Sequence, residues 1–165
     1  MQARLGKLEA YCSHFHTRSV RSSIPSSTVR QALEYARPPA DDTATLLLQF
    51  LRNVAADPGG CDKVIEAGAL PVVFGMLNLY PDDARVSYDA CELVSMFLQQ
   101  GFKSEVMRIP GFESSLRVAA SGTNRMSHSA EPRNQATVLL WKMGLLGPDD
   151  DIVSKFHLLL LLQAI

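Results

Sequence analysis

The chain has 165 residues, of which 47% are hydrophobic and 20% are charged, as in an ordinary folded domain and unlike a disordered chain. Its formal net charge is −1, but residues 1–37 contain six Lys or Arg against two acidic residues, so a basic start precedes an acidic body. No apolar run is long enough to span a membrane or to serve as a secretory signal.

Three cysteines, Cys12, Cys61 and Cys91, are an odd number and lie far apart in the sequence. This usage indicates a reducing compartment, in which the thiols act as small core hydrophobes. We therefore expect a cytoplasmic protein, with the nucleus or the mitochondrion as alternatives. The mitochondrial alternative depends on the basic, serine-rich start of the chain, which resembles a presequence.

Residues 1–23 are expected to form a basic helix or a flexible segment. Within them, Cys12, His14 and His16 alternate in the sequence CSHFH. Zinc requires four ligands, and the chain offers no second cluster nearby, so we expect no metal site. The stretch SSIPSSTVRQALEYA follows, in which a turn at Pro25 precedes a helix.

An apolar pattern begins in LLLQFLRNVA, residues 46–55, and returns in CELVSMFL, 91–98, and in TVLLWKMG, 137–144. The copies are separated by 43 and 46 residues, and apolar side chains recur in each at offsets 0, 3, 4 and 7. This spacing predicts three amphipathic helices that repeat with a period of about 43 residues. The four apolar columns are Leu47 with Ala90 and Ala136, Phe50 with Leu93 and Leu139, Leu51 with Val94 and Leu140, and Val54 with Phe97 and Met143.

The best-defined copy contains three helices, which are predicted at residues 60–66, 69–79 and 83–100. Gly68 separates the first two, in the stretch VIEAGALPVV, where a positive φ or a sharp meeting of two helices is needed. A shift of 43 residues leads from Gly68 to Gly111 in VMRIPGFESSL, so we expect a second and weaker glycine turn there.

The ends of these helices carry suitable residues. Pro71 falls in the first turn of its helix, where no amide partner is lost. Asp82 and Asp83 are predicted to cap the third helix and to meet its positive end. Residues 121–132 hold the three extra residues of the last copy and have loop composition. The stretch PDDD, 148–151, is interpreted as another helix cap rather than a cation site.

The stretch V-I-E-A-G-A-L-P-V-V, followed about two turns later by a long helix, resembles an armadillo repeat. The preceding FLRNVAADPGGCDKVIEAGAL resembles the end of one such repeat running into the next. The resemblance implies an all-α, right-handed solenoid of stacked three-helix armadillo-like repeats, with HEAT-type helix pairs as the nearest alternative. The expected organisation is a basic segment at 1–23, the repeats at 24–157 and an apolar C-terminal segment at 158–165.

Proteins of the armadillo family use their third helices to line a concave groove that holds an extended peptide or another subunit. Asn53 matches the asparagine that the family often places on this face, where its amide fixes a peptide backbone. Met96 and Lys142 do not match it, and no tryptophan precedes these positions by a turn, so the nuclear-import branch is not implied. The exposed columns are Gln49 with Glu92 and Val138, Arg52 with Ser95 and Trp141, and Asn53 with Met96 and Lys142.

Trp141 faces this groove by register, as an interface anchor does. The alternative is that a following helix, at 149–163, covers it as part of the core. Tyr88, one turn before Glu92, either joins the groove or packs beneath a loop. The residues expected to bind a partner are Gln49, Arg52, Asn53, Tyr88, Glu92, Met96, Trp141 and Lys142.

We therefore expect a non-enzymatic protein–protein interaction module, or scaffold, that binds a partner protein or an extended peptide in this groove. The alternative is a structural subunit that docks into a larger assembly, or self-associates, through the apolar residues Leu158–Ile165. The sequence contains none of the common nucleotide-binding motifs, and the repeats lack a basic stripe flanked by aromatic residues. We expect no catalysis, no cofactor, no nucleic-acid partner and no membrane span.

Overall fold

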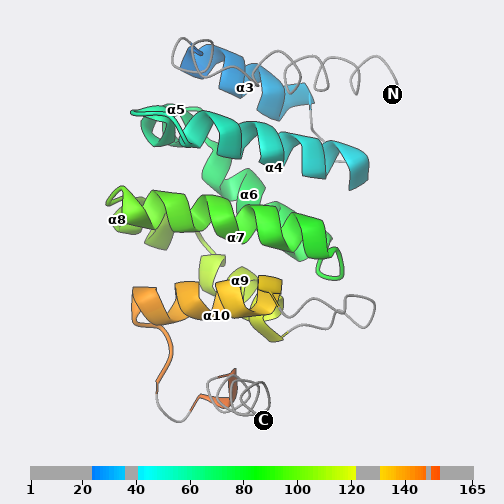
Figure 1. Cartoon of the computed structure of the whole chain (residues 1–165), viewed down its shortest axis with the longest axis vertical. Coiled ribbons are helices and arrows are strands. Elements are labelled where there is room, and N and C mark those ends of the chain that lie inside the picture. The colour runs from blue at the N-terminus through cyan, green and yellow to red at the C-terminus, as the bar shows by residue number, and fades with distance from the viewer. Residues whose placement is uncertain (1–23, 36–40, 122–130, 148–149, 153–165) are drawn as a thin grey trace.

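The computed structural model describes residues 24–35, 41–121, 131–147 and 150–152, and all regular secondary structure in these ranges is helical. The all-α prediction is therefore confirmed. The helices, labelled as in Figure 1, are α3 (Ser26–Tyr35), α4 (Asp41–Ala55), α5 (Gly60–Glu66), α6 (Ala69–Leu79), α7 (Ala84–Gln99), α8 (Lys103–Met107), α9 (Phe112–Ser121) and α10 (Glu131–Met143).

The three long helices α4, α7 and α10 lie one below another across the front of the molecule (Figure 1). Each packs on the next, because α4 contacts α7 and α7 contacts α10. The helices α6 and α9 lie behind them and contact each other, while α5 contacts both α3 and α4. Each long helix therefore has one side packed against the shorter helices and another side turned outward.

The helices α5, α6 and α7 occupy the ranges that the sequence predicts, to within one residue at each end. Gly68 precedes α6 with φ of 82°, which confirms the predicted positive φ. The carboxylate of Asp83 accepts hydrogen bonds from the backbone amides of Arg85, at 2.8 Å, and Val86, at 3.1 Å. Asp83 thus caps α7 as predicted, because these amides have no partner within the helix.

The helices α7 and α10 end in the same way. Each is followed by a glycine with positive φ, 92° at Gly101 and 76° at Gly144. In both places the next backbone amide donates a 2.9 Å hydrogen bond to a carbonyl five residues earlier. This Schellman arrangement satisfies carbonyl groups that the end of a helix leaves without partners.

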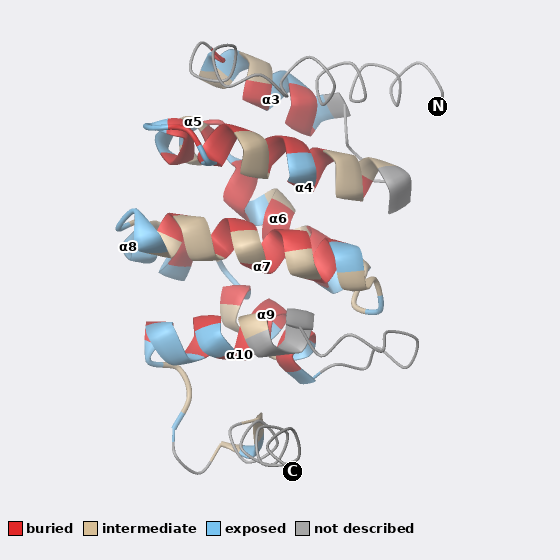
Figure 2. Ribbon diagram, viewed as in Figure 1, coloured by how far each residue is buried: buried red, intermediate tan, exposed pale blue. Residues whose placement is uncertain are grey.

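The core lies between the long helices and the shorter ones behind them (Figure 2). Every residue of the four predicted apolar columns is buried, which confirms the amphipathic pattern. Phe74 of α6 and Phe112 of α9 meet edge to face, with their ring centroids 6.2 Å apart. Cys61 and Cys91 are buried free thiols, as predicted, and burial raises the pKa of these thiols to about 11 and about 12.

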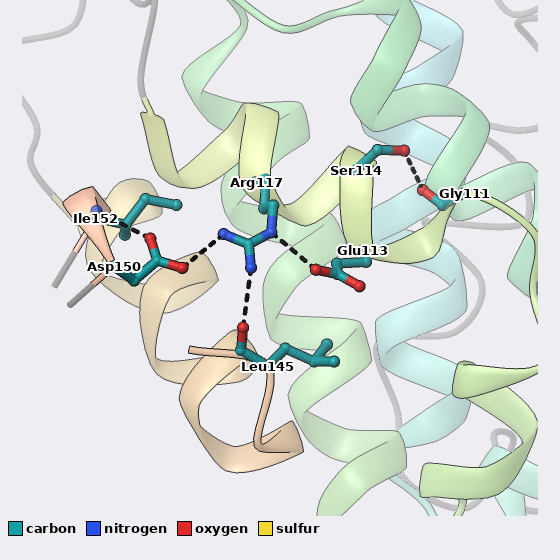
Figure 3. Close-up of polar contacts among 7 residues, drawn as sticks. All are labelled: Gly111, Glu113, Ser114, Arg117, Leu145, Asp150 and Ile152. Carbon is teal, nitrogen blue, oxygen red and sulfur yellow. Dashed lines mark hydrogen bonds and ion pairs between the residues drawn. The ribbon is translucent and has the colours of Figure 1, made fainter. Parts of the chain in front are cut away.

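Arg117 of α9 joins this helix to the chain that follows α10 (Figure 3). Its guanidinium donates hydrogen bonds of 2.9 Å to the Glu113 and Asp150 carboxylates and to the backbone carbonyl of Leu145. The hydrogen bonds to Asp150 and Glu113 raise the pKa of Arg117, while the hydrogen bond from Arg117 lowers the pKa of Asp150. The Asp150 carboxylate also accepts a 3.1 Å bond from the amide of Ile152, in agreement with the predicted cap.

The predicted loop at 121–132 is wrong at its two ends. Ser121 is the last residue of α9, and Glu131 and Pro132 open α10. The proline is compatible with this position because the first turn of a helix has no carbonyl partner for its missing amide hydrogen. Because the prediction followed residue composition, it made this loop too long at both ends.

Some predictions lie outside the described residues. They concern the basic segment 1–23 with its CSHFH stretch and the apolar segment 158–165. Among the residues that are described, no helix is long and apolar enough to cross a membrane.

Candidate functional site

A cavity of about 480 Å³ opens on the outward side of α4 and α7. Five of the eight residues predicted to bind a partner line it, together with Ala56. On α4 the spacing of three and four residues brings Gln49, Arg52 and Asn53 to one side, and on α7 Glu92 and Met96 are one turn apart. The lining residues are Gln49, Arg52, Asn53, Ala56, Glu92 and Met96.

Arg52 contributes the most extensive contacts in this cavity. Its Nη1 donates to the Oδ1 of Asp89, which joins α4 to α7 through an ion pair. The guanidinium carbon also lies 5.6 Å from the ring centroid of Tyr88, within the range of a cation–π contact. Tyr88 therefore supports Arg52 from α7 and is not among the residues that line the cavity.

The ion pair is unevenly buried, since the Arg52 side chain is 30% exposed and the Asp89 side chain is 8% exposed. Burial raises the pKa of the Asp89 carboxyl, and the hydrogen bond and positive charge of Arg52 oppose this rise. The Nε of Arg52 is buried and has no hydrogen-bond partner. Sequence reasoning missed Asp89; the available signal was an acidic residue directly before the apolar column position Ala90.

Glu92 makes a weaker contact with the next long helix. Its carboxylate accepts a 3.5 Å hydrogen bond from the side-chain amide of Gln135 on α10. The amide oxygen of Gln135 is buried without a partner. No cation in the described part of the chain forms an ion pair with Glu92. Gln135 lies directly before the apolar position Ala136. The sequence gives no sign of its contact with Glu92, which only the three-dimensional structure shows.

The predicted residues of α10 lie apart from the cavity. The Trp141 side chain is 68% exposed, Val138 beside it is 36% exposed, and Lys142 is also exposed. Trp141 thus lies on the surface of α10 rather than in the core. The helix at 149–163 that the alternative interpretation places over it falls almost entirely outside the described residues.

A second cavity, of about 530 Å³, lies at the turn between α8 and α9. Met107 is 43% exposed at its edge, and Ile109 and Phe112 contribute apolar surface. Arg117 lines it as well, but its guanidinium is already bonded to two carboxylates and a carbonyl. The sequence did not predict this cavity.

No protein family matches the chain, and comparisons with curated proteins and with solved structures find no match. Within the ranges that the structure describes, no group of three or more His, Cys, Asp or Glu residues is arranged to hold a metal ion. The candidate site is therefore the outward side of α4, α7 and α10, with the cavity beside Arg52 as its best-formed part.

Proposed function

We propose that the chain is an armadillo-like, right-handed solenoid that binds an extended segment of another protein along the outward sides of α4, α7 and α10. The order of contacts supports this proposal, because α4 packs on α7 and α7 on α10 while α6 packs on α9. A stack of equivalent helices presents equivalent positions side by side, which suits a ligand that runs across them.

The observation that carries the proposal is the convergence of predicted residues on one cavity. Gln49, Arg52, Asn53, Glu92 and Met96 were selected from the helix register and the armadillo resemblance, and all five line the same cavity. Its volume of about 480 Å³ lies within the usual range of ligand sites, roughly 300–1,000 Å³.

The chemistry of this surface suits a peptide backbone with side chains on both sides. The amides of Gln49 and Asn53 each offer a donor and an acceptor, which a backbone amide and carbonyl satisfy together. Met96 adds an adaptable apolar contact. Trp141, one helix further along, provides a large exposed ring of the kind that anchors interfaces.

The experiment is a selection of binders from a phage-displayed library of random linear peptides, with the full chain as target. Affinities of the selected peptides are then measured by fluorescence anisotropy. We expect Asn53→Ala to weaken binding about tenfold, since it removes a hydrogen-bonded amide. Asn78→Ala is the matched control, because Asn78 is an exposed asparagine of α6 outside the cavity.

If the selection yields no binders, or if the binders are equally sensitive to Asn53→Ala and Asn78→Ala, the groove is not a peptide site. Deletion of residues 158–165 tests the alternative role as an assembly subunit. A groove binder keeps its affinity after this deletion.

A further inference from the structure

The two charged side chains that line the cavity, Arg52 and Glu92, differ in whether an opposite charge pairs with them. Arg52 is paired with Asp89 and lies over the ring of Tyr88. Among the described residues, Glu92 has one polar partner, the Gln135 amide, through a 3.5 Å hydrogen bond. A ligand entering the cavity therefore meets one compensated cation and one uncompensated carboxylate.

Other charges near the cavity do not alter this balance. Arg85 lies on α7 one turn before Asp89 and acts on its carboxyl, but Arg85 is exposed and does not line the cavity. Lys142 is exposed on α10 and lies outside the cavity. Within the cavity, the open charge is the negative charge of Glu92.

We propose that the cavity takes a lysine or arginine side chain of the bound segment, and that Asp89 determines this preference by neutralising Arg52. The inference rests on the proposed function and names the chemistry of its ligand. Asp89 acts as a positioning residue, since it lies behind Arg52 and does not line the cavity.

The lining residues fit such a side chain along its length. Lysine and arginine carry an apolar stem of several methylene groups and a charged head. Met96 and Ala56 offer apolar contact for the stem, while Glu92 and the amide oxygens of Gln49 and Asn53 accept hydrogen bonds from the head. An acidic side chain in the same place is repelled by Glu92, and it finds Arg52 already paired.

Trp141 extends the preference along the groove. Its exposed indole ring is a favourable surface for a second cation, because the face of an aromatic ring attracts positive charge. A segment with two basic residues, one at Glu92 and one at Trp141, uses both features.

The test begins with peptides selected from the phage-displayed random library on the full chain. We expect lysine or arginine to be enriched at one position, and Glu92→Gln to weaken those peptides about tenfold. Glu66→Gln is the matched control, because Glu66 is exposed on α5 outside the cavity. A charge exchange follows, in which Glu92→Lys should restore binding of a peptide whose basic residue is replaced by glutamate.

Asp89→Asn tests the second half of the inference. Freed from its partner, Arg52 should attract an acidic side chain, so the preference for lysine over glutamate should fall about tenfold or more. Arg52→Gln removes the cation instead and should retain the preference for lysine. Circular dichroism and thermal melting establish that each variant is folded, and Arg52→Gln keeps the test decisive if Asp89→Asn does not fold.

The outcomes separate the two proposals. Selected peptides that depend on Asn53 but show no basic residue, or that tolerate Glu92→Gln, overturn this inference and leave the peptide groove standing. An enrichment of acidic residues overturns it as well, because Arg52 would then be the open charge. A failure to select any Asn53-dependent peptide overturns the proposed function, and this inference with it.

Discussion

The junction between α4 and α7 and the junction between α7 and α10 share one core pattern but differ on their outward sides. In both, residues of the same four apolar columns are buried. At the first junction, Arg52 lines a cavity and is held by an ion pair with Asp89 and by contact with the ring of Tyr88. At the second, a 3.5 Å hydrogen bond joins the Gln135 amide to the Glu92 carboxylate, and Trp141 is exposed.

The difference teaches that the two sides of a long helix follow different constraints. Every junction needs the same pattern of apolar side chains, because each must pack closely and keep water out. The outward side has no such requirement, so its residues are free to differ. At α4 and α7 they form a polar cavity, whereas at α10 they leave an aromatic ring in water.

The largest effect is expected from the shared core. Phe97 of α7 is fully buried, and Met143 occupies the equivalent column of α10. Phe97→Ala should lower the free energy of unfolding by about 3–5 kcal/mol, because it leaves a large cavity in a helix that packs on both neighbours. Met143→Ala should cost less, about 2 kcal/mol. Urea denaturation measures both, and equal losses would mean that the two junctions are packed alike.

The next effect concerns the polar links across the two junctions. A double-mutant cycle with Arg52→Ala and Asp89→Ala should give a coupling energy of about 1–3 kcal/mol, reduced from the value of a fully buried pair because Arg52 is partly exposed. The matched cycle with Glu92→Ala and Gln135→Ala should give about 0.5 kcal/mol or less, since the hydrogen bond is long. The contrast between the junctions fails if the second coupling equals the first.

A smaller effect is the dependence of stability on pH at Asp89. Burial raises its pKa above the ordinary value of 3.8 despite Arg52, so the folded state binds the proton more readily than the unfolded chain. Its contribution to the free energy of unfolding is therefore greatest below pH 3.8 and is lost as the pH rises through the raised pKa. The free energy of unfolding of the wild type minus that of Asp89→Asn should therefore fall as the pH rises through this window. A difference that grows would show that attraction to Arg52 outweighs burial.

The smallest effect is expected at Trp141, the exposed residue of α10. Trp141→Ala should change the free energy of unfolding by no more than about 0.5 kcal/mol, because the side chain is 68% exposed. Trp141 is the single tryptophan of the chain, so its fluorescence reports this position alone. Iodide should quench the emission of the free protein, and a bound peptide should protect it. A large loss of stability, together with resistance to quenching, would place the ring in the core.

Helix positions were predictable because the signals for them are local. A glycine at the turn, an apolar period within one helix and an aspartate at its start identified α5, α6 and α7 to within one residue. The loop at 121–132 failed at its ends for the same reason, since Ser121 and Pro132 favour a loop by composition but also suit the last and first turns of helices.

Helix register predicted which residues of the site share a face of one helix, but not which side chains meet between helices. Register placed Gln49, Asn53 and Met96 on one surface, but it carries no information on which side chains meet across two helices. The partner of Arg52 is Asp89, 37 residues away, and several acidic residues lie at comparable distances in the sequence. The role of Arg117 was missed because two of its three partners, Leu145 and Asp150, follow a different helix.

The three hydrogen bonds of Arg117 bear on how the protein opens locally. Two of them link α9 to Leu145 and Asp150, so unravelling the end of α10 breaks contacts that also hold α9. Amides around Gly144 should therefore exchange with solvent deuterium together with those of α9, as one cooperative unit. In Arg117→Ala, exchange at the end of α10 becomes faster and independent of α9. Arg117 is thus expected to determine whether α9 and the end of α10 open separately or together.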